Sequence, residues 1–380
     1  MWMKFFGFLI ILLIVACGDK ARKVDVNTFE QIKPVPKIKP VDAQEQTQRV
    51  ALLVPLTGEH AQLGQSLKNA AELSLFDNAN DHFNLIIQDT KGTSEGAAKA
   101  VQEALAKKAQ LILGPVFAYE VQSIKPYVFD KKIPIIAFSS DQKVKNKGMY
   151  VMGFSPRAQV KRIVSFAKAQ GIDQLVALIP LNPYGLLVEE ELKALEKSSE
   201  THLVKIVLYK GNGENLEEEL NLLKEKSYNG LLLPVGGDDL KLLLSNLHAF
   251  GFDLSKAKLL GTGLWDSPET QAMIDLRDSW YACIDPSERS SFENKYRESY
   301  GVLPTRIATL AYDAVSLATT LSDTGLQNPY SVDQLTQPQG FWGMDGLFRL
   351  KPDGTIDRSL AILKITPQGP QVLDKSEKQF

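Results

Sequence analysis

The sequence predicts an α/β protein made of two Rossmann-like lobes, each built around a parallel β-sheet. Apolar runs typical of strands alternate with helical patterns from Arg49 onward. The run at 50–54 is continuously apolar, as expected for a strand buried on both faces of a parallel sheet. A second set begins at 175, and both sets open with a strand that ends in Pro-Leu, at Pro55-Leu56 and Pro180-Leu181. A length of 380 residues is sufficient for two such units.

The first lobe is expected to alternate strands and helices in chain order. A helix over 64–77 follows the first strand, because its apolar side chains recur at helical spacing. A helix over 94–108 begins with a hydroxyl cap at Thr93 or Ser94. The strands are expected at 50–54, 83–88, 111–114, 133–138 and 149–154, with a further helix at 121–130.

The second lobe is expected to begin with a helix at Ser155-Pro156, where a hydroxyl N-cap precedes a proline in the first turn. The tail is too short for a third core, so its segments should complete the two lobes. One of them is a hairpin that pairs 347–350 with 361–365 around Asp353-Gly354. The other strands are expected at 175–179, 203–209, 231–235, 258–261 and 280–284, and the other helices after Tyr184 and at 216–226, 238–250, 292–300 and 306–321.

The N-terminus has the pattern of an export signal at 1–16. Lys4 precedes an apolar run at 5–16, which is too short to span a bilayer, since a span takes roughly 20 residues. Its end, Ile14-Val15-Ala16-Cys17, resembles the lipobox of bacterial lipoproteins. The resemblance implies cleavage before Cys17, attachment of diacylglycerol to its thiol, and acylation of the new N-terminus by a fatty acid such as palmitate. An ordinary signal peptide with an unmodified cysteine is the alternative.

Residues 17–48 are predicted to form a lipidated tether rich in lysine and proline. Relaxed, it would reach on the order of 30 Å, and fully extended about 100 Å. Resemblance to enterobacterial sorting signals places the anchor at the periplasmic face of the outer membrane, because Gly18 follows the cysteine. Asp19 leaves the inner membrane as the alternative.

The composition and motifs argue against an enzyme or a nucleic-acid-binding protein. The 43 Lys and Arg residues nearly balance the 45 Asp and Glu residues, whereas nucleic-acid binding needs a basic surface. The G-x-S-x-G match at 92–96 does not directly follow a strand, so it favours a helix cap over a nucleophile elbow. Four histidines are isolated, and Cys283 lies in an apolar run typical of a buried thiol. We therefore expect no catalytic residue, no metal and no cofactor.

Five motifs of the sequence are Pro55-Leu56-Thr57-Gly58, Asp89-Thr90-Lys91-Gly92-Thr93, Ile112-Leu113-Gly114-Pro115, Asn182-Pro183-Tyr184-Gly185 and Gly261-Thr262-Gly263-Leu264-Trp265-Asp266. Together these motifs resemble the type I periplasmic binding proteins of the branched-chain amino-acid class, and among them the penicillin-binding-protein activator lipoproteins. The resemblance implies a Venus-flytrap fold whose two lobes are joined by three crossovers, here near 155, 266 and 325. Lobe 1 would then comprise 49–155 plus 266–325, and lobe 2 would comprise 156–265 plus 326–380.

Within this fold, ligands gather at the carboxyl ends of the strands. The segment after the third strand, Pro115–Ala118, contains no Ser or Thr, although amino-acid binders use a hydroxyl there to hold the α-carboxylate. Loops that only turn the chain are the alternative to a binding role. The rule selects Thr57, Gly58, Pro115, Ala118, Ser139 and Ser140 from lobe 1, with Tyr184 and Asp266 closing the cleft from lobe 2 and the hinge.

The resemblance implies a non-enzymatic periplasmic lipoprotein that regulates peptidoglycan synthesis by binding a bifunctional penicillin-binding protein. Those activators often carry an extra N-terminal helical domain, and this chain has only the tether in that place. The alternative is a substrate-binding lipoprotein that delivers an amino acid or similar small solute to an ABC permease. A sensor that couples cleft closure to a partner is a third hypothesis. Contact with the membrane is expected through the lipid anchor only.

Overall fold

The computed structural model describes residues 47–380, apart from 79–80, 212, 214 and 224. The predicted signal peptide at 1–16, the lipidation site Cys17 and nearly all of the tether at 17–48 lie outside the described residues. Residues Gln46–Phe380 form one compact unit. Within the part of the chain that the structure describes, no helix is both long enough and apolar enough to cross a membrane.

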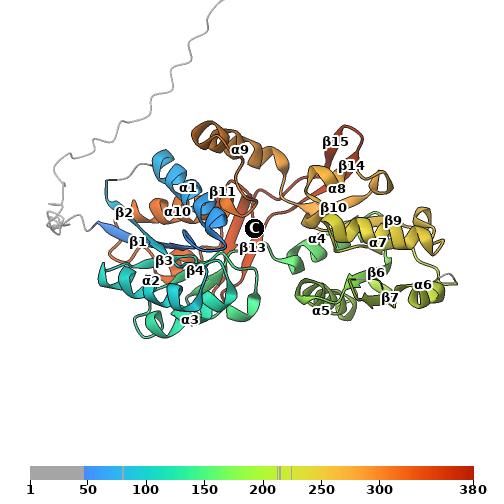
Figure 1. Ribbon diagram of the computed structural model, residues 1–380, viewed down its shortest axis with the longest axis horizontal. Coiled ribbons are helices and arrows are strands. Elements are labelled where there is room, and N and C mark those ends of the chain that lie inside the picture. The colour runs from blue at the N-terminus through green and yellow to red at the C-terminus, as the bar shows by residue number, and fades with distance from the viewer. Residues whose placement is uncertain (1–46, 79–80, 212, 214, 224) are drawn as a thin grey trace, which may run out of the picture. The chain divides into compact units, whose positions relative to one another are not determined.

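A sheet of five parallel strands in the order β2-β1-β3-β4-β5 defines lobe 1 (Figure 1). Alternate residues of the first strand enter two different cores: Val50 and Leu52 pack on one face, and Ala51 and Leu53 on the other. Burial on both faces is the reason that the run is continuously apolar. The strands are β1 Gln48–Val54, β2 Phe83–Asp89, β3 Leu111–Leu113, β4 Ile135–Ala137 and β5 Met149–Val151.

Helices cover both faces of the lobe 1 sheet. On one face, α1 (Ala61–Asp77) and α10 (Ala308–Ser322) lie side by side although they are far apart in the chain (Figure 1). α9 (Pro286–Tyr300) adds aromatic side chains to the same core. On the other face, α2 (Ser94–Ala106) and α3 (Ala118–Val128) bury small and branched residues.

A second sheet of seven strands in the order β15-β14-β10-β9-β8-β6-β7 defines lobe 2. Strands β6 to β10 are parallel, and β14 and β15 extend the sheet in antiparallel pairing. The predicted α/β fold with two parallel sheets is therefore confirmed. The strands are β6 Gln174–Pro180, β7 His202–Tyr209, β8 Gly230–Leu232, β9 Lys258–Gly261, β10 Trp280–Cys283, β14 Ala361–Thr366 and β15 Gly369–Asp374.

The helices of lobe 2 also cover two faces of their sheet. α4 (Pro156–Ala169) and α5 (Pro183–Lys197) pack on one face, and α6 (Leu216–Leu223) and α7 (Gly237–Ala249) pack on the other. The short helical segments are η1 Gln142–Val144, η2 Leu254–Lys256, η3 Gly263–Trp265, α8 Pro268–Gln271, η4 Ile274–Leu276 and α11 Val332–Leu335.

The predicted hairpin in the tail is wrong in its pairing. β12 (Gly346–Leu350) pairs with β13 (Ile356–Arg358) around Asp353-Gly354, and β11 (Phe341–Gly343) adds a third antiparallel strand. The turn is tight because Asp353 accepts hydrogen bonds from the backbone and hydroxyl of Thr355. The apolar run at 361–365 instead forms β14, which pairs with β10 in the interior of the lobe 2 sheet.

Two of the three predicted crossovers are also displaced. The first crossover between the lobes lies between β5 and α4, at the position predicted near 155. The second lies between β10 and α9, and the third between β13 and β14, rather than near 266 and 325. Residues 266–283 therefore belong to lobe 2, because β10 pairs with β9. Residues 341–358 belong to lobe 1, because Phe348 and Ile356 pack in the core that α1 and α10 share.

Two helix starts test the capping predictions. The Thr93 side chain accepts a hydrogen bond from the backbone N–H of Gly96 at 3.0 Å, so the G-x-S-x-G match is the start of α2, as expected. Ser155 stands at the N-cap of α4, before Pro156, but its hydroxyl makes no capping hydrogen bond. The position was predicted correctly, whereas the hydrogen bond was not.

Candidate functional site

A cavity of about 480 Å³, here called the cleft, is lined by segments at the carboxyl ends of strands in both parallel sheets. The segments that follow β3, β4 and β5 contribute from lobe 1, and those that follow β6 and β9 contribute from lobe 2. The end of β10, the start of α10 and Leu360, just before β14, complete the lining. This is the edge of an α/β sheet at which ligands bind, because loops diverge there and leave a crevice.

Four of the predicted site residues line the cleft: Ala118, Ser139, Ser140 and Tyr184. The Tyr184 hydroxyl donates a hydrogen bond to Thr262 Oγ1 at 2.9 Å. Burial raises the pKa of Tyr184 to about 12, so its side chain is a neutral hydrogen-bonding group near pH 7. The Ser139 hydroxyl accepts a hydrogen bond from the Asp141 backbone at 3.1 Å. The structure brings these four residues together, and their role toward a ligand stays a prediction.

Three predicted lobe 1 residues do not line the cleft. The Thr57 hydroxyl donates to Asp89 Oδ2 at 2.6 Å, which ties the loop after β1 to the end of β2. Gly58 has a φ of 85°, so it supplies a left-handed turn residue. Pro115 follows a cis peptide bond, and its carbonyl accepts a hydrogen bond from the backbone of Phe138. All three take part in the structure of their loops, and their role toward a ligand stays a prediction.

Asp266 also lies outside the cleft lining, contrary to the prediction. Its Oδ2 accepts a hydrogen bond from Arg289 Nη1 at 2.7 Å, and the two side chains are only 5% and 13% exposed. Arg289 is bound in turn by Glu293 through its Nε at 2.7 Å. The Asp266 carboxylate therefore forms an internal ion pair between η3 and α9, and its role toward a ligand stays a prediction.

The cleft residues that the sequence analysis did not select include Phe154, Gln159 and Arg306, which contribute an aromatic ring and two polar groups. Gln159 Oε1 accepts a hydrogen bond from the backbone of Gly263 at 2.8 Å. The Arg306 guanidinium lies over the Phe154 ring, 4.2 Å from its centroid. Gln159 and Arg306 lie in or beside predicted helices, and no local pattern separates them from solvent-exposed polar residues.

Arg306 belongs to a cluster of buried charges next to the cleft. Its Nη1 donates to Asp345 Oδ1 at 3.2 Å, and Asp345 also accepts a hydrogen bond from the Thr309 hydroxyl. Asp313 and Arg358 add a second acid and a second guanidinium to the cluster, and the Arg358 Nη2 donates to the Met152 carbonyl at 3.3 Å.

Burial sets the protonation behaviour of this charged cluster. It raises the pKa of Asp313 well above its usual range, with the nearby charge of Asp345 acting in the same direction. Burial also lowers the pKa of Arg358, although the two carboxylates act in the opposite direction. Phe154 contacts both guanidiniums, since the Arg358 group lies 5.2 Å from its ring centroid. Phe154 lies in the first crossover between the lobes, and it contacts two guanidiniums, those of Arg306 and Arg358, from later parts of the chain.

Cys283 lines the cleft as a free, buried thiol. Burial raises its pKa, and the neighbouring charge of Asp266 raises it further. A thiol with a raised pKa carries little thiolate and is a poor nucleophile. The prediction of a buried thiol is confirmed. Among the described residues, no group of three or more His, Cys, Asp or Glu side chains could hold a metal ion.

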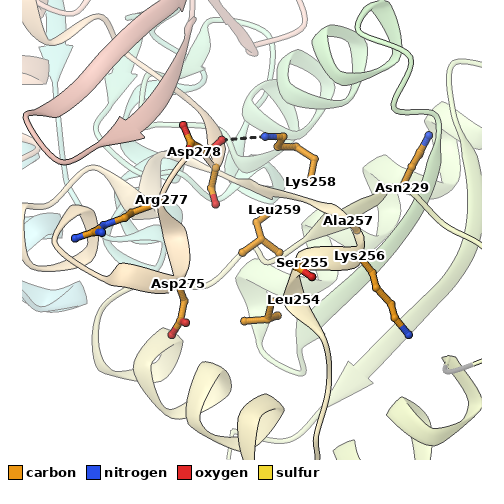
Figure 2. A pocket seen from close by; sticks show the side chains of 11 residues that line it. Asn229, Leu254, Ser255, Lys256, Ala257, Lys258, Leu259, Asp275, Arg277 and Asp278 are labelled. Carbon is orange, nitrogen blue, oxygen red and sulfur yellow. Dashed lines mark hydrogen bonds between the residues drawn. The ribbon is translucent and has the colours of Figure 1, made fainter.

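A second cavity of about 450 Å³ lies at the opposite, amino-terminal ends of β9 and β10 (Figure 2). Lys258 points across it, and its ammonium donates to the Asp278 carbonyl at 3.2 Å. The Arg277 and Lys256 side chains point away from the hollow in Figure 2. The cavity contains none of the predicted site residues, so the cleft is the candidate site.

Comparisons with known proteins identify the fold and find both solved structures and sequence relatives that resemble this chain. The family model described as "Periplasmic binding protein" matches residues 47–370. A periplasmic ligand-binding protein of a branched-chain amino acid ABC transporter from Burkholderia xenovorans superimposes with a TM-score of 0.70 at 16% identity. The match covers 86% of this chain and 94% of that one. A leucine-binding protein from Thermotoga maritima gives 0.61 at 17% identity, covering 86% and 97%. At these identities the solved structures show a shared fold.

The relatives found by sequence match only part of this chain. An uncharacterized protein of Rickettsia prowazekii is 23% identical over 223 residues, which are 56% of this chain and 59% of that protein. The penicillin-binding protein activator LpoA of Vibrio cholerae is 24% identical over 202 residues, which are 52% of this chain and 31% of the activator. The chain therefore spans less than two thirds of either relative. The characterised proteins among these matches are binding proteins and an activator, not enzymes.

Proposed function

Since the chain belongs to the periplasmic binding protein family, we propose that it is a non-enzymatic lipoprotein that regulates peptidoglycan synthesis by binding a penicillin-binding protein. The partner would be a bifunctional enzyme that both polymerises and cross-links glycan strands. One observation carries the choice of a regulator over an amino-acid carrier: among the described residues that line the cleft there is no acidic side chain.

An amino acid presents an ammonium group and a carboxylate on the same carbon, and a site that selects it needs a partner for each. Asp266 is the acidic residue that was predicted for the cleft, and Arg289 already binds it. The segment Pro115–Ala118 after β3 offers no hydroxyl side chain for the carboxylate. Gln159 and Tyr184 already have partners within the chain. These features favour a regulator.

The similarity to the Vibrio cholerae activator supports a penicillin-binding protein as the partner. The match covers 52% of this chain and 31% of that protein, and we propose that the contact lies on the binding-protein lobes of this chain. We propose that binding of a lobe surface changes the activity of the synthase without chemistry in this chain.

The proposed location follows from the N-terminal pattern. A lipid on Cys17 would hold the protein at the periplasmic face of the outer membrane, with the inner membrane as the alternative. The tether at 17–48 would let the lobes move from about 30 Å to about 100 Å from the anchor. That range suits a partner that works in the cell wall.

A second candidate function is solute delivery to an ABC permease. The observation that favours it is the cleft itself, which lies at the carboxyl ends of the strands of both sheets and has about 480 Å³ available. This volume lies within the range of small-molecule sites in proteins, about 300–1,000 Å³. The solved structures of similar fold include transporter binding proteins.

One experiment separates the two functions. The body Gln46–Phe380, which contains all four hydrophobic clusters, is titrated against a detergent-solubilised bifunctional penicillin-binding protein from the same organism. We expect saturable binding and a faster rate of glycan polymerisation. A monofunctional transpeptidase is the control and should not respond.

The same preparation is screened by thermal unfolding with the common amino acids. A ligand at 100 times its Kd adds about 2.7 kcal/mol to the free energy of unfolding. Stabilisation of this size by an amino acid, together with no binding to the synthase, would overturn the proposal and establish the solute-delivery function.

A further inference from the structure

A hollow of about 590 Å³, here called the hinge groove, lies between the lobes but outside the cleft. Lobe 1 contributes η1, the residue Lys145 and the segment 351–357, and lobe 2 contributes α4 and α5. Ser155 lines it from the first crossover between the lobes. Among the described residues, none lines both the hinge groove and the cleft. The hinge groove is therefore a separate candidate site, with a volume in the range of small-molecule sites.

Cations outnumber acids along the hinge groove. Five lysine and arginine side chains line it, against three carboxylates, and each of these carboxylates already has a partner. Arg157 pairs with Glu190 and, at 3.7 Å, with Glu191. Lys351 Nζ lies 2.9 Å from Asp357 Oδ1. The groove therefore keeps an excess of positive charge, which attracts an anion.

The excess charge resides in Lys143 and Lys161, because the fourth and fifth cations are paired and Lys145 binds Asp353 at 3.3 Å. Lys143 belongs to η1 on the lobe 1 wall, and Lys161 belongs to α4 on the lobe 2 wall. Both residues are exposed, and neither side chain makes a hydrogen bond or an ion pair within the described chain. The charge of Lys161 also acts on the nearby carboxyl of Glu191, which Arg157 already binds. Each wall thus offers one cation to an occupant.

Uncharged groups of the hinge groove add further requirements. The Gln142 Oε1 atom is buried and has no hydrogen-bond partner within the described chain. Buried acceptors in native proteins nearly always have a donor, so this atom suits a hydroxyl or N–H of an occupant. The Ser155 hydroxyl makes no capping hydrogen bond to α4 and is a further donor. Ala158, Leu187 and Ile356 give the lining an apolar surface for carbon atoms.

We propose that the hinge groove binds a small organic anion that carries at least two carboxylates and a hydroxyl group. Its carboxylates pair with Lys143 and Lys161 on opposite walls, and its hydroxyl donates to Gln142 Oε1. One carboxylate is insufficient, because water screens an exposed lysine and two such pairs must act together. A phosphate concentrates its charge at one centre, whereas the two cations lie on different lobes, so separated carboxylates fit better. This inference does not depend on the proposed function.

The test is isothermal titration of the body Gln46–Phe380 at low ionic strength with citrate, tricarballylate, acetate and pyrophosphate. Citrate and tricarballylate carry the same three carboxylates, and only citrate has a hydroxyl group. We expect saturable citrate binding and about fivefold weaker tricarballylate binding, the loss of one hydrogen bond. Acetate should not saturate at millimolar concentration, and pyrophosphate should bind more weakly than citrate. Added sodium chloride should weaken citrate binding, because it screens exposed charges.

Charge-reversal variants locate the site. Lys143→Glu and Lys161→Glu should each weaken citrate binding by about fivefold, and the double variant by more than about tenfold, since each replaces an attraction by a repulsion. Both side chains are exposed and unpaired, so the variants should fold. Lys131→Glu in lobe 1 and Lys197→Glu in lobe 2 are matched controls, because they change an exposed lysine outside the groove by the same charge. They should leave citrate affinity unchanged.

A variant of Gln142 tests the hydrogen bond separately from the charges. Gln142→Leu should bind citrate and tricarballylate equally well, because the acceptor for the citrate hydroxyl is removed. The inference is overturned if citrate does not saturate at millimolar concentration, or if acetate or pyrophosphate binds as tightly as citrate. Equal citrate affinity in the double variant and the two controls would also overturn it. Citrate binding that responds to Arg306→Gln but not to the lysine variants would assign the anion to the cleft instead.

Discussion

Replacement of Asp266 by Asn should destabilise the junction between η3 and α9, because it removes one charge of a buried ion pair. The carboxylate lies 2.7 Å from Arg289 Nη1, with the two side chains 5% and 13% exposed. Asparagine keeps the shape and can still accept a hydrogen bond. The loss therefore comes from the uncompensated charge of Arg289 in a poorly solvated site.

The size of the effect follows from what remains around Arg289. Breaking a buried pair by removing one partner costs about 3–5 kcal/mol. Here Glu293 still binds Nε at 2.7 Å, but its side chain is 38% exposed and water screens it. We therefore expect the free energy of unfolding to fall by about 3 kcal/mol, the low end of that range.

The assay is urea unfolding of the body, followed through tryptophan fluorescence, to which Trp265, fully buried beside Asp266, contributes. A double-mutant cycle with Arg289→Gln isolates the pair, and partners in direct contact should show a coupling free energy of about 0.5–3 kcal/mol. Asp238→Asn is the matched control, since Asp238 forms an exposed pair with Lys241 and should leave the urea midpoint unchanged.

Two results would refute this reasoning. A midpoint shift for Asp266→Asn no larger than that of the Asp238 control would show that the pair contributes little. Strictly additive effects of the two variants in the cycle would show that Asp266 acts through something other than Arg289. Loss of ligand affinity with unchanged stability would restore the cleft role that the sequence analysis assigned to Asp266.

Three further predictions concern the packing and titration of buried groups. Gly261→Ala should lower the free energy of unfolding by more than about 2 kcal/mol and alter the near-ultraviolet circular dichroism of Trp265, because the added Cβ would lie 2.2 Å from the indole ring. Gly211→Ala is the control, since nothing lies within 4 Å of a Cβ at that position. Wild-type stability of the Gly261 variant would contradict the packing described for Trp265. Burial raises the pKa of Asp313 above its ordinary 3.8, so the native carboxyl binds a proton more tightly than the unfolded one. The free energy of unfolding of the wild type relative to Asp313→Asn should therefore fall as the pH rises above 3.8 through the raised pKa, and equal differences in urea midpoint at about pH 5 and about pH 8 would argue against it. Cys283 should stay unmodified by a thiol reagent in the native body and react completely in urea, and rapid native labelling would show that its thiol is exposed.

Local patterns in the chain predicted the strands and helices of both lobes well. Val50–Val54 and Val176–Ile179 are apolar throughout because their alternate side chains enter cores on opposite faces of a sheet. The cap was predicted at Thr93 or Ser94, and Thr93 makes the hydrogen bond, which joins residues only three apart. These features depend on near neighbours, and near neighbours are visible in the sequence.

Prediction was poorer where the pairing joins distant parts of the chain. The strand at 361–365 was given the wrong partner, because any apolar strand can pair with any other and its true partner, β10, is far away in sequence. The crossovers near 266 and 325 were misplaced for the same reason. Residues Ala118, Ser139, Ser140 and Tyr184 reached the cleft as expected, since strand ends in a parallel sheet share one edge.

Short stretches of residues are sufficient to predict two α/β lobes with parallel sheets, since burial on both faces of a strand and helical amphipathicity are local patterns. The polar side chains that face the cleft, in contrast, are known only from the folded arrangement of the chain. Asp266 and Arg306 are both charged residues near predicted strand and helix ends. Asp266 pairs with Arg289 and does not line the cleft. Arg306 contacts Asp345 and Phe154 and does line the cleft. The availability of a charge depends on partners distant in the chain, and those partners meet only when the chain folds.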